Sequence, residues 1–288
     1  MQKSPDLPSP VFHRAFLFVL AAACAVPALA QPSKFDLPVD RPAKGNGDQA
    51  EGARILAEFR AAGIVGDYWL AFELRVMPRK GAERSVTGIL LGTRGPGGPL
   101  SRLELADERW LIESGAQPAA WLAAAGGTPR ELGAGEAGHA LAGTGVTVFE
   151  LQRPFLYWTD FNYEGQAIVR GRPTHSFVLR PPAGRPVPVA GLAGVRVLLD
   201  AEFSAMVQAE ELGADGAVLK TITLLDLKKV GSQWLPKTID VRDGRSRDKT
   251  RFSVTAAALG LDLPLAAFTA DNLTAEPPVV PKDKVVRF

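Results

Sequence analysis

Cysteine is the residue type that this chain of 288 residues has least of, and histidine is among the next rarest. Cys24 is the single cysteine, so the chain can form neither an internal disulfide nor a metal centre built from several thiolates. Three histidines are present, and no two of them have the spacing of a metal site. We therefore predict a protein without cofactor or metal, whose core forms by burial of the apolar residues that make up 46% of the chain.

An excess of one charge is missing as well. The 33 lysines and arginines nearly balance the 31 aspartates and glutamates, which leaves a formal net charge of +2. Nucleic-acid-binding proteins usually carry a clear basic excess, so we predict no nucleic-acid partner. The apolar run at residues 15–26 is too short to cross a bilayer as a helix.

That short apolar run has the surroundings of a signal peptide. Lys3 and Arg14 precede it, and Ala28-Leu29-Ala30 supplies the small residues that a signal peptidase recognises before Gln31. We predict an exported protein that is cleaved near Ala30.

The alternative is lipid anchoring at Cys24. A good acylation site carries leucine three residues before the cysteine, whereas Leu20 lies four residues before it here. We therefore favour soluble export, and we divide the chain into a signal peptide (1–30), a flexible N-terminal tether (31–47), a single domain (48–276) and a C-terminal tail (277–288).

The clearest helix signal begins at Asp48. This residue can cap a helix, Glu51 three residues later completes a capping box, and Gly63 is a suitable stop. One apolar stripe at helical spacing lies between them, formed by Ile55, Leu56, Phe59 and Ala62.

After this helix the apolar period changes to two, as in a half-buried strand. The alternating residues are Tyr68, Leu70, Phe72, Leu74 and Val76. Further strands are predicted at residues 85–93, 100–106, 109–113, 146–152, 166–170, 175–180, 195–200, 205–211, 218–228, 234–242 and 249–257. Short turn signals at residues 215–216, 230–232 and 243–244 join the last of them into hairpins, which indicates an antiparallel sheet with one or two helices on one face.

The segment 114–145 is dominated by alanine and glycine. We predict a short helix at residues 119–125 and a mobile remainder that could serve as a lid.

No arrangement typical of catalysis is recognisable. His175 shares a strand face with Phe177 and Leu179, which favours a packed histidine over a general base, and His139 lies among glycines. The adjacent Glu210 and Glu211 must point to opposite faces of a strand, so they cannot share a site. Asp243, near Asp240, is better explained by its turn. We therefore predict that the protein is not an enzyme.

Basic residues gather in the second half of the chain. We interpret them as a solvated outer face of the sheet, with a surface for anionic lipid or an acidic partner as the minor hypothesis. They are Arg170, Arg172, Lys228, Lys229, Lys237, Arg242, Arg245, Arg247, Lys249 and Arg251.

Five aromatic residues fall within the nine positions 155–163. This density fits neither a helical nor a strand period, so we expect an irregular connection that crosses the open side of a curved sheet. Core packing and cavity lining explain the run equally well.

The second half also carries a family resemblance. Gly171-Arg172-Pro173-Thr174 leads into a strand, and the later segments 210–216, 220–221, 226–229, 234–237 and 249–252 continue the pattern. The chain resembles the outer-membrane lipoprotein-sorting proteins of the LolA/LolB-like superfamily, in its uncharacterised branch. Where the best-known carriers have an Arg-Pro stretch with aromatic residues, this chain has Thr93-Arg94-Gly95-Pro96, followed by Arg102.

The resemblance implies a mainly β (α+β) fold, with an unclosed, strongly curved antiparallel β-barrel of about ten strands and one or more helices covering the concave side. It also implies a periplasmic carrier whose cavity holds lipid or lipoprotein acyl chains, with an inner- or outer-membrane protein as a further partner. The alternative is a non-carrier sensor or interaction module of the same fold that regulates a membrane partner. The residues expected to line the cavity are Leu70, Phe72, Leu74, Phe155, Tyr157, Trp158, Phe161, Tyr163 and Phe177.

Overall fold

The computed structural model describes residues 40, 42–43, 45–124, 126–203 and 205–288. The predicted signal peptide (1–30), with Cys24 and the cleavage site before Gln31, lies outside the described residues. So does most of the predicted tether (31–47).

One antiparallel sheet dominates the described residues. It has fourteen strands in the order β6-β5-β4-β3-β2-β1-β13-β12-β11-β10-β9-β8-β7, and β14 pairs with β13. The strands are β1 (Asp67–Met77), β2 (Arg84–Gly95), β3 (Gly98–Leu105), β4 (Glu108–Glu113), β5 (Ala119–Ala124), β6 (Arg130–Glu131), β7 (Asp160–Val169), β8 (Arg172–Arg180), β9 (Leu192–Asp200), β10 (Met206–Gly213), β11 (Val218–Val230), β12 (Gln233–Asp243), β13 (Lys249–Leu261) and β14 (Val286–Arg287).

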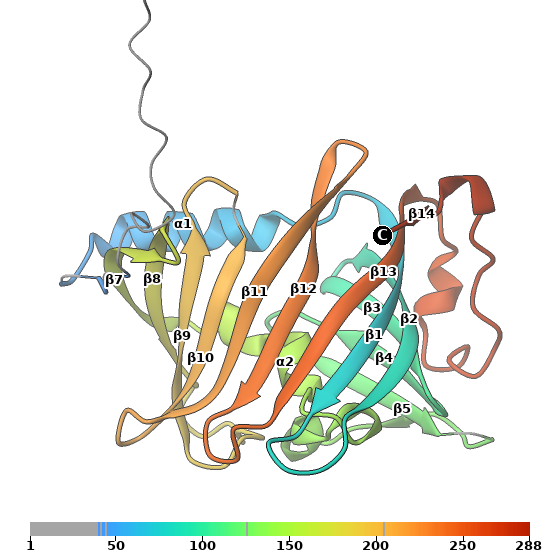
Figure 1. The fold of residues 1–288 in the computed structure, drawn as a ribbon, viewed down its shortest axis with the longest axis horizontal. Helices are drawn as coiled ribbons and strands as arrows, with labels where there is room; N and C mark the ends of the chain where they lie inside the picture. The colour runs from blue at the N-terminus through green and yellow to red at the C-terminus, as the bar shows by residue number, and fades with distance from the viewer. Residues whose placement is uncertain (1–39, 41, 44, 125, 204) are drawn as a thin grey trace, which may run out of the picture. The chain divides into compact units, whose positions relative to one another are not determined.

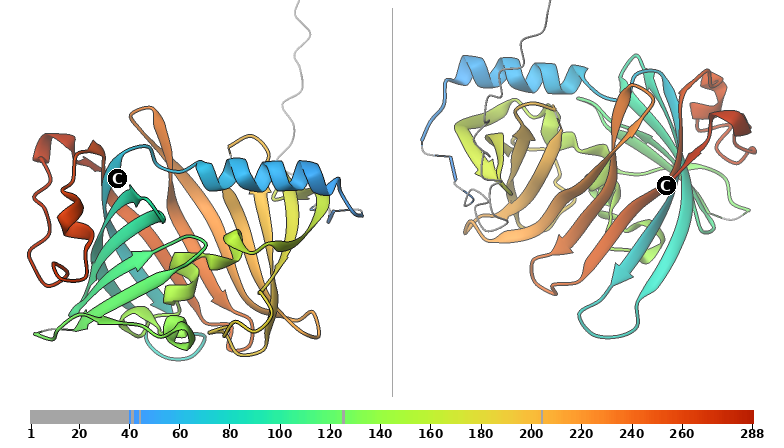
Figure 2. Two further views of the ribbon diagram at one scale, coloured as in Figure 1. Left: turned by 180° about the vertical axis from the view of Figure 1, so that it is seen from behind. Right: turned by 45° about the horizontal axis from the view of Figure 1, so that its top comes forward.

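The sheet consists of two meanders joined along β1 and β13. Strands β1 to β6 form the first meander and β7 to β13 form the second, so the sheet order leaves β6 and β7 at opposite edges. The sheet curls without closing, and α1 lies on its concave side (Figures 1 and 2). The predicted fold class is confirmed, with more strands than the expected ten.

The helical elements are short. They are α1 (Gln49–Ala61), α2 (Val148–Gln152) and the 3-10 helices η1 (Ala134–Gly138), η2 (Leu141–Gly143), η3 (Pro154–Tyr157), η4 (Leu265–Phe268) and η5 (Lys282–Lys284). The Asp48 side chain accepts hydrogen bonds from the backbone N–H groups of Ala50 and Glu51, which confirms it as the N-cap of α1. The helix ends before Gly63, which has a φ of +140°.

The main hydrophobic core fills the concave side of the sheet. Inward-facing strand residues from both meanders pack there against Leu56 of α1 and against the buried side chains of α2 and η3. Because both curled halves of the sheet contribute, this core holds the two meanders together.

Two predicted elements are wrong. Residues 119–125, expected to be helical, contain the strand β5, because the alanine-rich segment pairs with β4 from Glu108↔Ala124 to Glu113↔Ala119. This pairing outweighs the helix propensity of alanine. Residues 146–152, predicted to be a strand, instead include the helix α2. Most side chains of this helix are buried, so its apolar residues do not follow a helical period in the sequence.

The outer face of the first meander has a second hydrophobic core. Its centre consists of buried residues from the strands and from the C-terminal segment 262–288, including Leu91, Leu111, Phe268 and Leu273. The region predicted as a C-terminal tail runs along this face and ends in β14, whose Val286 pairs with Ala257 of β13.

Candidate functional site

The concave side of the sheet is the candidate site, and α1 covers it (Figure 2). At its N-terminal end, the Gln49 side chain accepts a hydrogen bond from the Tyr163 N–H (2.8 Å) and donates one to the Tyr163 carbonyl (3.0 Å). The side chain thus pairs with the free edge of β7 as another strand would. Gly52 allows this approach, because a Cβ atom there would lie 2.6 Å from the Tyr163 Cβ.

The C-terminal end of α1 is held by Arg60 and by Arg94 of β2, whose guanidinium donates a hydrogen bond to the carbonyl of the C-cap residue Ala62 (3.1 Å). Arg60 Nε donates a hydrogen bond to the Leu156 carbonyl, and its guanidinium lies 5.7 Å from the centroid of the Tyr157 ring. Burial lowers the pKa of Arg60, although not enough to remove its charge. Between the two ends only Gly52 and Leu56 are buried, so α1 is attached mainly at its ends.

The aromatic run lies under this helix in two groups. Phe155 and Trp158 pack against Phe149 of α2, with ring centroids 5.8 Å and 6.4 Å from the Phe149 centroid. Phe161 and Tyr163, at the start of β7, pack against Phe177 of β8 at 6.3 Å and 4.8 Å. The run is therefore irregular because it passes from η3 into β7.

The structure brings together eight of the nine predicted cavity residues. Leu70 belongs to a neighbouring cluster with Leu235 and Ala257. Six of the eight are buried in the main core and two, Tyr157 and Phe161, are partly exposed; the eight are Phe72, Leu74, Phe155, Tyr157, Trp158, Phe161, Tyr163 and Phe177. These side chains pack against one another on the concave side. None of them lines the two surface grooves on the outer face of the sheet.

Helix α2 crosses the concave side and contacts both meanders through buried polar side chains. Gln152 Nε2 donates hydrogen bonds to the carbonyls of Ala119 (2.9 Å) and Glu113 (3.4 Å) in the first meander. Glu150 forms an ion pair with Lys220 of β11 in the second meander and also accepts hydrogen bonds from Thr147. These contacts place a polar group inside an otherwise apolar core.

Glu211 lies next to this ion pair. It faces inward on β10 opposite Lys220, is 1% exposed, and neither carboxylate oxygen has a hydrogen-bond partner among the described residues. Burial, followed by the negative charge of Glu150, raises the pKa of Glu211 to about 8. A protonated Glu211 suits this site, because one lysine then balances one ionised carboxylate.

Glu210 and Glu211 point to opposite faces of β10, as the sequence predicted, but the burial of Glu211 was not predicted. Glu210 points outward and pairs with Arg196 at 3.1 Å. Glu211 follows the buried Ala209 on the inward-facing side of the strand. This position marks it as an ionisable residue in the core, but its partner Glu150 comes from a helix that the sequence pattern did not reveal.

His175 and His139 both have ordinary packing contacts. His175 Nδ1 lies 2.7 Å from the Tyr163 hydroxyl, and burial lowers the pKa of the imidazole. The His139 ring packs 5.4 Å from Trp110. Among the described residues, no three histidine, cysteine, aspartate or glutamate side chains are grouped as a metal site would require, and no helix has the length and apolar character needed to cross a membrane.

Comparisons with known proteins place the chain in a family. The model of a family described as "Uncharacterized protein" matches residues 121–275, more than half of the chain. The chain belongs to this family. No curated protein matches the sequence at a significant level.

Solved structures share the fold at low sequence identity. A putative outer membrane lipoprotein-sorting protein domain from Vibrio parahaemolyticus is 16% identical, with a TM-score of 0.70 over 78% of this chain and 99% of that one. A DUF1329 family protein from Desulfovibrio piger is 12% identical, with a TM-score of 0.69 over 78% of this chain and 98% of that one. A LolA superfamily protein from Nitrosomonas europaea is 16% identical, with a TM-score of 0.58 over 75% of this chain and 96% of that one. The resemblance found in the sequence is confirmed at the level of the fold.

Proposed function

We propose that this domain is a periplasmic, non-enzymatic carrier of lipid or lipoprotein acyl chains, active in outer-membrane lipoprotein sorting or a related envelope process. The chains would enter between the concave face of the sheet and a cover formed by α1 and η3. An inner- or outer-membrane protein would deliver or receive them. The solved structures named above support the proposal through their shared fold.

The observation that carries the proposal is the way α1 covers the aromatic residues. Large apolar side chains such as Phe155 and Trp158 lie beneath a helix whose polar contacts with other described elements are confined to its two ends. Release of Arg60 from Leu156, together with release of the Ala62 carbonyl from Arg94, would free the C-terminal half of α1 while Gln49 holds the other end. The exposed aromatic surface would then need another apolar partner, and an acyl chain is one.

The second candidate is a sensor or interaction module with a filled interior. Helix α2 favours it, because Gln152 and Glu150 connect this helix to both meanders across the space that a ligand would occupy. In this case the domain would regulate a membrane partner through its surface and would bind no lipid.

Native mass spectrometry of protein purified without detergent distinguishes the two candidates. Retained lipid that is released on denaturation supports the carrier. A mass equal to the polypeptide alone, together with no binding of a fluorescent fatty-acid probe, supports the sensor module.

Substitutions locate the probe if it binds. Trp158→Ala should weaken probe binding by about 1–2 kcal/mol, because it removes a ring from the cover. Phe72→Ala should instead cost roughly 3–5 kcal/mol of unfolding free energy, because Phe72 lies on β1 at the centre of the sheet, 5.0 Å from Phe252.

The matched control is Trp121→Ala, which removes a tryptophan from the opposite face of the sheet. This variant should leave probe binding unchanged. Equal losses of binding in Trp121→Ala and Trp158→Ala would show that the probe reports general loosening of the fold.

Export is part of the same proposal. We expect the mature protein to begin at Gln31 without acylation, which N-terminal sequencing and the intact mass can establish. A mature mass that corresponds to diacylated Cys24 would instead place the protein on a membrane.

A further inference from the structure

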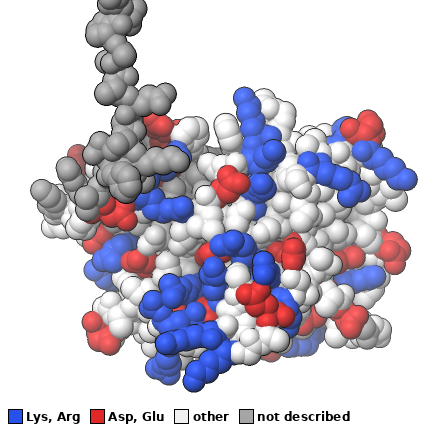
Figure 3. All heavy atoms as spheres, in the orientation of Figure 1, with Lys and Arg blue, Asp and Glu red and all other residues white. Residues whose placement is uncertain are grey.

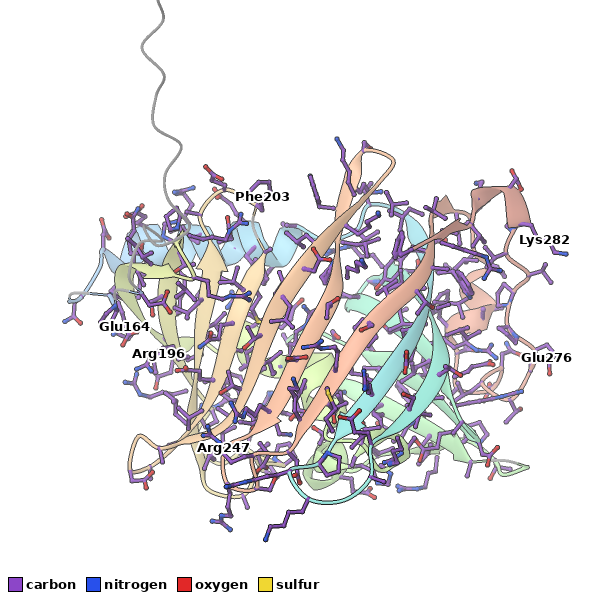
Figure 4. The ribbon with its side chains drawn as sticks, viewed as in Figure 1. Glu164, Arg196, Phe203, Arg247, Glu276 and Lys282 are labelled. Carbon is purple, nitrogen blue, oxygen red and sulfur yellow. The ribbon has the colours of Figure 1, made fainter. Side chains whose placement is uncertain are left out.

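Two adjoining surface grooves lie on the outer face of the second meander, opposite the concave side. The first has a volume of about 410 Å³ and is lined by residues of β11, β12 and β13, including Thr221, Thr223, Arg242 and Lys249. The second is lined by Arg79, Arg242 and Arg247. Figure 3 shows Lys and Arg side chains gathered on the lower part of this face, and Figure 4 labels Arg247 there.

Cross-strand pairing builds the floor of the first groove. Thr221 lies opposite Arg242, which lies opposite Lys249, so one row of the outer face carries a hydroxyl and two cations. The floor is therefore rigid and rich in hydrogen-bond donors.

The arginines around the grooves differ from those elsewhere on the same sheet. Arg196 pairs with Glu164 at 3.4 Å and with Glu210 at 3.1 Å, and Figure 4 labels Arg196 beside Glu164. By contrast, the side chains of Arg79, Arg242 and Arg247 form no ion pair or hydrogen bond with any described residue. These three guanidinium groups are free to bind an external anion.

Asp240 and Asp243 also line the first groove, and their carboxylates already have partners within the chain. Asp240 accepts two hydrogen bonds from Arg251 and lies 3.4 Å from Lys249 Nζ. The Asp243 side chain accepts from the backbone of Arg245 and Ser246. Asp248 accepts from the Arg79 N–H, which ties the loop after β1 to the turn between β12 and β13.

The backbone of that turn holds Arg247 in an unfavourable conformation. Its φ is +67°, in the left-handed region that favours glycine. The left-handed conformation is less favourable in free energy for arginine than for glycine. No contact of the Arg247 side chain with a described residue offsets this cost. A functional contact outside the chain would explain why arginine stands there.

We propose that these grooves bind the phosphate headgroups of anionic phospholipids and so dock the second meander on a membrane surface. The planar guanidinium group matches phosphate oxygens with two parallel hydrogen bonds, and the volume of the first groove falls within the range of about 300–1,000 Å³ typical of small-ligand sites. A headgroup fits this concave shape better than the surface of an acidic protein does. Since the site lies on the outer face, the proposal does not depend on acyl-chain binding inside the sheet.

The test compares two double variants with the same change of charge in co-sedimentation with vesicles. Arg242→Gln/Arg247→Gly removes two groove arginines and places a favourable glycine at the strained position. Arg130→Gln/Arg180→Gln removes two half-exposed arginines that form surface ion pairs elsewhere. Vesicles of phosphatidylcholine with phosphatidylglycerol are compared with phosphatidylcholine alone, and circular dichroism checks that each variant is folded.

We expect the wild type to bind only the anionic vesicles. The groove variant should bind them about thirty-fold more weakly, which corresponds to about 1 kcal/mol for each arginine, while the control variant binds as the wild type does. Raised salt should weaken wild-type binding.

Three results would overturn the proposal. The first is an equal loss in both double variants, which would indicate attraction by net charge alone. The second is a wild-type protein that does not co-sediment with anionic vesicles. The third is a rise in the melting temperature with inorganic phosphate and no vesicle binding, which would indicate a site for free phosphate.

Discussion

The two segments that cover the sheet are attached in very different ways. The C-terminal segment lies on the outer face of the first meander, where Leu263, Ala267, Phe268 and Leu273 are buried and β14 extends the pairing of β13. Arg102 of β3, 1% exposed, donates to four carbonyl groups of this segment. Helix α1, on the concave side, has two buried residues, and its polar contacts with other described parts of the chain lie only at its ends.

The comparison indicates which covering can move. Separating the C-terminal segment would break the hydrogen bonds from Arg102 and expose several fully buried apolar side chains. Separating α1 would expose one apolar helix stripe with the aromatic residues beneath it and break a few exposed or half-buried hydrogen bonds. Local opening should therefore occur at α1, and the C-terminal segment should open only with global unfolding. If the proposed carrier function is correct, α1 is the covering that opens.

The largest expected effect is that of Arg102→Met. Loss of the guanidinium leaves the carbonyls of Ala267 and Asn272 without their donor, so the free energy of unfolding should fall by roughly 3–5 kcal/mol. Urea denaturation measures it. As a control, Arg109→Met removes donors to Thr274 and Ala275 from a more exposed side chain and should cost far less. Equal losses would mean that Arg102 contributes no more than a surface contact.

A matched pair of leucines tests the comparison directly. Leu56 of α1 and Leu273 of the C-terminal segment are both 0% exposed. Leu273→Ala should cost about 2–5 kcal/mol, whereas Leu56→Ala should cost less, because the helix can detach at a lower free energy. Hydrogen exchange should rise in residues 49–61 of the second variant without a matching rise in β1. Equal losses of stability would show that both coverings unfold together.

The buried Glu211 gives a pH dependence of defined sign. Its pKa of about 8 in the folded state lies above the ordinary carboxyl value, so the folded protein holds a proton that the unfolded chain releases. Stability from this group is complete below pH 4 and falls by about 1.4 kcal/mol per pH unit until it levels off near pH 8. Glu211→Gln should remove that slope and stabilise the protein at pH 8 by something on the order of 2 kcal/mol.

The measurement is the difference in unfolding free energy between wild type and Glu211→Gln from pH 5 to 8. Using the difference cancels His175, whose lowered pKa makes a contribution of opposite sign over the lower part of this range. Glu150, Lys220 and Asp243 face Glu211 and remain in both proteins. A difference that does not change with pH would mean that Glu211 is ionised in the fold.

The smallest effect is expected for Arg60→Met, which removes the contact between α1 and η3. Stability should fall by about 0.5–1.5 kcal/mol. If α1 is the cover, the fatty-acid probe should also bind and dissociate faster in stopped-flow measurements. Arg54→Met is the control and should change neither quantity, because Arg54 lies on the same helix and its one partner among the described residues is the exposed Glu58.

Local patterns predicted much of the sheet. Features that depend only on neighbours in the chain could be predicted from the sequence. They include the alternation in β1, the Asp48 cap and the turn glycines after β10 and β11. The errors at β5 and α2 have the opposite cause. The state of Ala119–Ala124 is decided by its pairing with β4, and that of Val148–Gln152 by burial on all sides.

By itself, the sequence determined the antiparallel class, the early helix and the aromatic run, because periodicity, caps and turns act over a few residues. Only the tertiary structure decided that Glu150 and Glu211 meet in the core and that Arg102 holds the C-terminal segment. It alone also placed around one pair of grooves three arginines whose side chains pair with no described residue. Each of these arrangements joins residues that are far apart in the chain. Their geometry depends on how the two meanders curl around a common core, which no local pattern records.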